Sequence, residues 1–223
     1  MPLSPGVHFI EPTIPVHVFE ADTPGPTAII QAGIHGDEVA GVHAVQELLE
    51  ARLRPARGRL LLIPVMNPGA YRARERAAPG GLDLNRSFPG DAEAPELERR
   101  LARRFLDLCT DERPALVATL HESKKRYDPS VVPSFGQTIV YGVDPMPGIV
   151  QRTVDALNRS KRSDDEVWAP QFYPVATSST EIIVDTVGCI GLCIETWMGF
   201  GERRRIDMQK EVVGLLLADI GVL

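Results

Sequence analysis

Short apolar runs alternate with segments of helical periodicity along this chain, and this alternation restricts its fold more than any other feature. Runs with the composition of strands lie at Val16–Phe19, Thr27–Gln31, Arg59–Val65, Ala115–Leu120, Thr138–Tyr141 and Gly191–Thr196. Segments whose apolar residues recur at three- and four-residue spacing lie at Glu38–Leu53, Pro95–Leu108, Met146–Leu157 and Ile206–Ile220. This order predicts an α/β fold with a mostly parallel mixed sheet and helices on both faces.

The bulk properties predict one domain and exclude several classes of partner. A chain of 223 residues fits a single domain, 1–223, and 43% hydrophobic with 24% charged residues is ordinary for a globular protein. The net charge of −6 argues against a nucleic-acid partner, and no apolar run is long enough to predict a membrane span. The N-terminus lacks the pattern of a signal peptide and the three cysteines are a poor disulfide framework, so a cytoplasmic location is expected. The sequence leaves the oligomeric state open.

Histidines and glutamates follow several of the predicted strands. His35 and Glu38 follow Thr27–Gln31, His121 follows Ala115–Leu120, and Glu195 lies at the end of Gly191–Thr196. Ligand crevices of open α/β sheets form at the carboxyl ends of the strands. We therefore expect these residues, far apart in sequence, to converge on one rim.

The Gly-Ile-His-Gly-Asp-Glu loop that ends at Glu38 has the composition of a metal site. His35 and Glu38 offer a nitrogen and a carboxylate three residues apart, and Gly33 and Gly36 allow the backbone to bend tightly around them. A catalytic zinc site has three protein ligands and one open position, and His121 is the best-placed third ligand. On its own, His121 would fit a structural histidine as well. The loop favours one zinc ion per chain.

Other polar residues suit the chemistry of hydrolysis. A carboxylate at the end of an apolar strand is out of place unless it is paired or catalytic, so Glu195 is a candidate general base and acid. The fork of Arg86 can bind a substrate carboxylate with help from the amide of Asn85, and Arg76 can bind a carboxylate or polarise a scissile carbonyl. The alternative for the arginines is a solvated surface charge. Asp83 is expected to orient a metal-bound histidine.

Taken together, these residues resemble the zinc carboxypeptidase-like (M14-type) hydrolases, and within them the succinylglutamate desuccinylase/aspartoacylase branch. The Gly-Ile-His-Gly-Asp-Glu stretch is similar to that branch's zinc loop, and Leu120-His-Glu and Ile194-Glu-Thr resemble its third-ligand site and its catalytic-glutamate strand. Asn67-Pro-Gly-Ala-Tyr-Arg, Arg76 and Asp83-Leu-Asn-Arg-Ser-Phe-Pro-Gly resemble its substrate loop in order and spacing. The resemblance runs from about Ala28 to Met198.

The resemblance implies a role for each matching residue. It assigns zinc binding to His35, Glu38 and His121, proton transfer to Glu195, oxyanion stabilisation to Arg76, and substrate-carboxylate binding to Asn85 and Arg86. Related peptidases use a mobile tyrosine before the catalytic glutamate, and Tyr173, 22 residues before Glu195, suits that position. The alternative for Tyr173 is a packed aromatic side chain.

The chain departs from that branch in one respect. Its members carry a β-rich C-terminal domain, whereas only residues 196–223 follow Glu195 here, and they read as a turn and a helix. We expect that domain to be absent and the site to be more open. The polar segment Glu122–Asp128 is expected to be a solvated loop, with a lid or specificity loop as the alternative.

The expected function is zinc-dependent hydrolysis of an amide or ester bond in a small substrate that carries a free carboxylate, such as an N-acyl amino acid. One alternative is an M14-type carboxypeptidase or cell-wall peptide amidase that acts on short peptides, because single-domain bacterial members with that activity are about this compact. The other is a non-catalytic protein that binds zinc and a carboxylate.

Overall fold

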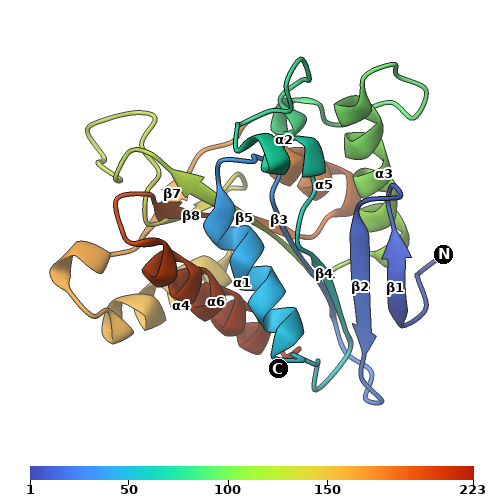
Figure 1. Ribbon diagram of the computed structural model, residues 1–223. Coiled ribbons are helices and arrows are strands. Elements are labelled where there is room, and N and C mark those ends of the chain that lie inside the picture. The colour runs from blue at the N-terminus through green and yellow to red at the C-terminus, as the bar shows by residue number, and fades with distance from the viewer.

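An eight-stranded mixed sheet runs through the computed structural model, which describes residues 1–223 (Figure 1). Its strands are β1 (Gly6–Phe9), β2 (Pro15–Glu20), β3 (Thr27–Ala32), β4 (Arg59–Ile63), β5 (Leu116–Ser123), β6 (Thr138–Tyr141), β7 (Ala169–Phe172) and β8 (Ile190–Trp197). Their order is β1-β2-β4-β3-β5-β8-β6-β7. The four central strands β4, β3, β5 and β8 are parallel, and β2 and β6 flank them in antiparallel pairing.

Helices cover both faces of this sheet, which confirms the predicted fold class. They are α1 (Val39–Glu50), α2 (Pro68–Ala73), α3 (Leu97–Glu112), α4 (Gly148–Ser160), α5 (Ser179–Val187) and α6 (Glu202–Asp219), with short 3-10 turns at Leu84–Arg86 and Asp164–Glu166. Helices α1, α4 and α6 lie on the face toward the viewer in Figure 1, and α3 and α5 lie behind the sheet. None of the helices is long and apolar enough to cross a membrane.

The buried side chains of the central strands alternate between two apolar clusters, one on each face. On β3, Ile30 joins the cluster under α1, α4 and α6, whereas Ile29 joins the cluster under α3 and α5. On β5, Leu120 belongs to the first cluster, so the next side chain, His121, faces the opposite side. This alternation places His121 and Glu122 on opposite faces of the sheet.

The structure extends the predicted elements at the site. The strands predicted to end near His121 and Glu195 continue to Ser123 and Trp197, and the two residues are paired in register on β5 and β8. The segment 67–93, which holds the residues that resemble the family's substrate loop, contains α2 and a 3-10 turn. Strands β1 and β7 and helix α5 were not predicted, because they are short and bury few apolar side chains.

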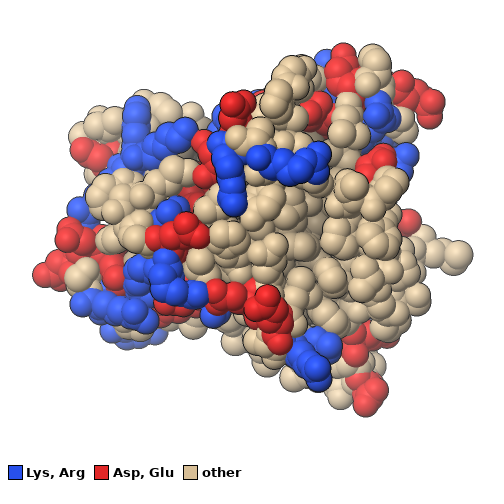
Figure 2. All heavy atoms as spheres, viewed as in Figure 1, with Lys and Arg blue, Asp and Glu red and all other residues tan.

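Charged residues of both signs are interspersed on the surface shown in Figure 2, mainly over the helices of that face and on the loops at its top and bottom. A broader uncharged area lies over the part of the sheet formed by β2 and β4, which no helix covers in this view (Figures 1 and 2). The charges at the carboxyl ends of β3, β5 and β8 are of more consequence for function.

Candidate metal centre

Two glycines shape the loop that connects β3 to α1 and carries His35 and Glu38. Gly33 has a positive φ of 67°, a conformation that side chains rarely adopt. Gly36 lies against α2, and a Cβ atom there would stand 1.9 Å from the carbonyl oxygen of Ala70. The predicted tight bend is therefore present, and the second glycine is required by close packing.

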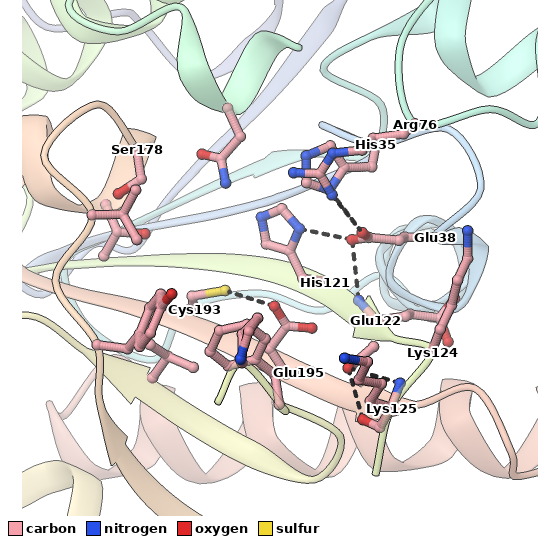
Figure 3. Close-up of a pocket in the computed structure, with 18 of the residues that line it drawn as sticks. His35, Glu38, Arg76, His121, Glu122, Lys124, Lys125, Ser178, Cys193 and Glu195 are labelled. Atoms are coloured by element: carbon pink, nitrogen blue, oxygen red, sulfur yellow. Dashed lines mark hydrogen bonds and ion pairs between the residues drawn. The ribbon is translucent and has the colours of Figure 1, made fainter. Parts of the chain in front are cut away.

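The carboxylate of Glu38 lies between the two histidines (Figure 3). His35 Nδ1 is 2.7 Å from Glu38 Oε1, and His121 Nδ1 is 2.7 Å from Glu38 Oε2. All three side chains are buried, although they come from a loop, a helix N-terminus and a strand. The structure thus brings together the three predicted ligands.

Glu38 can face the histidines because another carboxylate caps its helix. Glu38 is the N-cap residue of α1, a position whose side chain commonly accepts a backbone hydrogen bond, but it makes none. Ala40 N–H donates to Glu122 Oε2 at 2.9 Å instead. Glu122 in turn pairs with Arg205 of α6, and its side chain is fully buried. The backbone N–H of Glu122 also donates to Glu38 Oε2 at 3.1 Å.

The donor set fits a divalent metal ion. The candidate ligand atoms of His35, Glu38 and His121 all lie within 4.8 Å of one another. Two imidazole nitrogens and a carboxylate form a ligand set found in catalytic zinc sites. On the far side of the His35 ring, Nε2 donates to Asp83 Oδ1 at 3.3 Å, the contact expected of Asp83. This bond leaves Nδ1 as the atom that faces the site.

Burial and neighbouring charges act in opposite directions on the pKa values of His35, Glu38 and His121. Burial lowers the pKa of His35, but the Glu38 charge and the bonds to Asp83 and Glu38 outweigh it and raise that pKa to about 9. For His121 burial dominates and lowers the pKa. Burial opposes ionisation of Glu38, yet the two histidines hold its pKa well below its usual range. A metal ion would take the place of the proton on His35.

Glu195 lies beside this trio on the neighbouring strand. Its carboxylate is shown below His121 in Figure 3, and Cys193 Sγ donates to Glu195 Oε1 at 3.6 Å. Burial, and then the negative charge of Glu38, raise the pKa of Glu195 to about 8. A carboxyl group with a pKa near neutrality can both accept and donate a proton.

The loop between α2 and α3 brings cations and an amide to the same place. Arg76 Nε donates to Asp83 Oδ2 at 2.9 Å, and its guanidinium is half exposed. Asn85 Oδ1 accepts hydrogen bonds of 3.0 Å from both the backbone N–H and the hydroxyl of Ser179, at the start of α5. Because its oxygen is occupied, Asn85 has its amide NH2 free to donate to a ligand. Arg86 is exposed, and its guanidinium donates a hydrogen bond of 3.0 Å to the backbone carbonyl of Asn85 in the same loop.

A single cavity of about 360 Å³ joins these groups. Every residue predicted for the site lines it: His35, Glu38, Arg76, Asn85, Arg86, His121, Tyr173 and Glu195. Tyr173 is half-buried and packs edge-on against Phe135, with ring centroids 4.9 Å apart. Lys124 and Lys125, from the polar segment after His121, also line the cavity. That segment therefore forms part of the cavity wall.

Several contributors to the site were not predicted from the sequence. Glu122 and Arg205 fix the start of α1, Ser179 orients Asn85, and Glu181 lines the cavity. The capping-box pattern Ser178-x-x-Glu181 signals the start of a helix and could have located α5. No comparable local signal marks Arg205.

The sequence of residues 24–128 matches the family described as the succinylglutamate desuccinylase/aspartoacylase catalytic domain. N-alpha-acetyl-L-2,4-diaminobutyric acid deacetylase of Halomonas elongata is 44% identical over 89 residues, which cover 39% of this chain and 25% of the relative. The chain thus spans about a quarter of the length of that curated relative.

Two solved structures share the fold. The product-bound cell shape determinant protein Csd4 of Helicobacter pylori has a TM-score of 0.85 at 16% identity, over 95% of this chain and 56% of that chain. A succinylglutamate desuccinylase/aspartoacylase of Rhodobacter sphaeroides has a TM-score of 0.71 at 24% identity, over 94% of this chain and 60% of that chain. The fold is therefore zinc carboxypeptidase-like. Together with the family match, it confirms the resemblance to the succinylglutamate desuccinylase/aspartoacylase branch.

Proposed function

We propose that this chain is a zinc-dependent hydrolase that cleaves an amide or ester bond in a small substrate bearing a free carboxylate, such as an N-acyl amino acid. The convergence of His35, Glu38 and His121 with Glu195 in one cavity carries the proposal. The Halomonas relative, whose name describes a deacetylase of an acylated amino acid, supports this substrate class.

His35, Glu38 and His121 would hold one zinc ion. Bound there, zinc would supply a Lewis acid and lower the pKa of water at the open position. The rest of the reaction depends on side chains of this chain.

Glu195 would take the proton from the attacking water and pass it to the leaving amine. Its place beside the ligand trio, where desolvation raises the pKa of Glu195, supports both steps, because desolvation strengthens a carboxylate as a base. Arg76 would stabilise the negative charge that develops on the scissile carbonyl oxygen. Its guanidinium is held by Asp83 and remains half exposed, so one side can face a ligand.

Asn85 and Arg86 would bind the substrate carboxylate. Ser179 supports this role, since it occupies the oxygen of Asn85 and leaves the NH2 group as the ligand donor. Tyr173 lines the same cavity and would contribute a hydroxyl donor to the substrate.

A carboxypeptidase acting on short peptides is the second candidate. The structural match to Csd4 favours it, since one of those structures is described as a D,L-carboxypeptidase with bound mDAP and has a TM-score of 0.80. A panel of N-acetyl- and N-succinyl-amino acids against dipeptides and muropeptides separates the two activities. A non-catalytic zinc protein would have no need of a carboxylate at Glu195, which is half-buried and forms no ion pair.

Replacing Glu195 by Gln tests the mechanism. We expect E195Q to retain zinc and lose turnover, because Gln keeps the shape of the side chain but cannot carry the proton. Metal content measured beside turnover distinguishes loss of the base from loss of the site. Turnover by E195Q equal to that of the unmodified protein would exclude Glu195 as the base.

A further inference from the structure

The carboxylate of Glu181 lines the proposed substrate cavity without a partner. Glu181 lies in the first turn of α5 and is half-buried. Its side chain accepts no hydrogen bond and forms no ion pair, whereas the half-buried carboxylates of Asp37 and Asp83 pair with Lys124 and Arg76. Neither zinc binding nor proton transfer uses this charge.

Helix capping does not account for Glu181. In a capping box, the glutamate three residues after the N-cap accepts the N–H of the N-cap residue. Here Ser178 N–H donates to the carbonyl of Val175 at 2.8 Å, so only the serine half of the box is made, with Glu181 N–H donating to Ser178 Oγ at 3.3 Å. The carboxylate is directed elsewhere.

Gly142, just after β6, provides the space for that carboxylate. A Cβ atom at Gly142 would stand 1.6 Å from Glu181 Oε1. The carboxylate therefore packs directly on the backbone at the end of β6, one strand beyond β8 and two beyond the β5 strand of His121.

Nothing near Glu181 compensates its charge. Burial, and then the like charge of Asp185 one turn along the helix, raise the pKa of Glu181. The cations that line the cavity, Arg76, Arg86, Lys124 and Lys125, come from the α2–α3 loop and from the end of β5. The cavity thus has cations around the metal centre and an uncompensated carboxylate at its β6 side.

We propose that Glu181 binds a cationic group at the end of the substrate side chain, so that the preferred substrate is an N-acylated basic amino acid. This inference rests on the proposed hydrolase function. The carboxylate of such a substrate would meet Asn85 and Arg86, and its distal ammonium would meet Glu181. The first turn of α5 would then contact both ends of the substrate: Ser179 orients Asn85 at the carboxylate end, and Glu181 binds the ammonium end.

The strand register places the Glu181 carboxylate some way along the sheet from Glu195. Val140 of β6 pairs with Cys193 of β8, and continuing this antiparallel register places Gly142 level with Gly191. Gly191 is four residues before Glu195, about 13 Å along the strand at the usual rise. This separation along the sheet leaves room for an extended substrate side chain that ends near Glu181.

Matched substrates test the assignment with the zinc-loaded protein. Nα-acetyl-L-lysine and Nα-acetyl-L-norleucine have similar length, and only the first carries the ammonium. We expect the kcat/KM ratio of lysine to norleucine substrate to exceed one, and to fall about 10- to 100-fold in E181Q, as for a lost charge-assisted hydrogen bond. E50Q, which changes an exposed carboxylate at the end of α1, should keep the ratio.

A direct binding measurement separates this inference from the proposed function. Calorimetric titration with free lysine and norleucine needs no turnover, and tighter binding of lysine that depends on Glu181 would support the inference even if neither substrate is cleaved. Equal hydrolysis of both substrates, or an E181Q variant that loses both equally, would overturn the inference and leave the hydrolase assignment standing.

Discussion

Replacing Arg205 by Met is expected to destabilise the protein strongly, because it leaves a buried charge without a partner. The Glu122 side chain is 0% exposed and that of Arg205 is 12% exposed. Removing one partner of a buried pair costs about 3–5 kcal/mol. The lower end applies, because Glu122 keeps the hydrogen bonds from Ala40 N–H and from the Thr196 hydroxyl.

A loss of about 3 kcal/mol corresponds to about 6–12 °C in Tm for a protein of this size. Urea or thermal unfolding of the metal-free protein measures it directly. The double variant E122Q/R205M should be less destabilised than R205M alone, since no charge is then stranded. The exposed Arg203, on the same helix, is the matched control, and R203M should change the midpoint little.

The same substitution should weaken metal binding. Glu122 fixes the N-terminus of α1, which carries Glu38, and partners that orient ligands typically affect affinity by about 10–100-fold. Competition with a zinc chelator would report this change. If R205M kept the wild-type Tm and zinc affinity, the Glu122–Arg205 pair would have no role in organising the site.

Three further variants test separate parts of the structure. G36A should lose stability and zinc uptake, because its Cβ would meet the carbonyl of Ala70. The control G214A lies in open space on α6 and should raise the free energy of unfolding by about 0.5–1 kcal/mol. Unchanged zinc uptake by G36A would contradict the packing argument. Arg204 holds the pKa of Glu166 below its ordinary 4.5, so this pair stabilises the fold above that pH and is lost as the pH falls through the folded-state pKa. Unfolding measured between pH 6 and about 3 should therefore show a shallower loss of stability in E166Q than in the unmodified protein; equal slopes would count against the pair.

Features that depend on local sequence could be predicted well. His35 and Glu38 lie within four residues of each other in a glycine-rich loop, so the pattern alone places them on one turn. His121 and Glu195 follow strongly apolar runs, and parallel strands bring such ends together. The fold class followed from the same alternation of strands and helices.

Features that depend on long-range contacts could not be predicted. Glu122 caps α1 across 82 residues, and Ser179 orients Asn85 across 94. Helix α5 escaped detection because it has only nine residues, and three of its four apolar residues, Ile182–Val184, are consecutive rather than spaced at three and four. Strand β7 includes Pro170, and proline is tolerated at a sheet edge but discourages a strand prediction.

The metal content of the purified protein, measured beside that of a His121→Ala variant, tests the zinc assignment. We expect about one zinc ion per unmodified chain, and loss of stoichiometric zinc when His121 is removed, because two ligands do not complete a catalytic zinc site. An unmodified chain that carries no divalent metal and takes none up at stoichiometric level, or a variant that binds zinc as tightly as the unmodified chain, would contradict it.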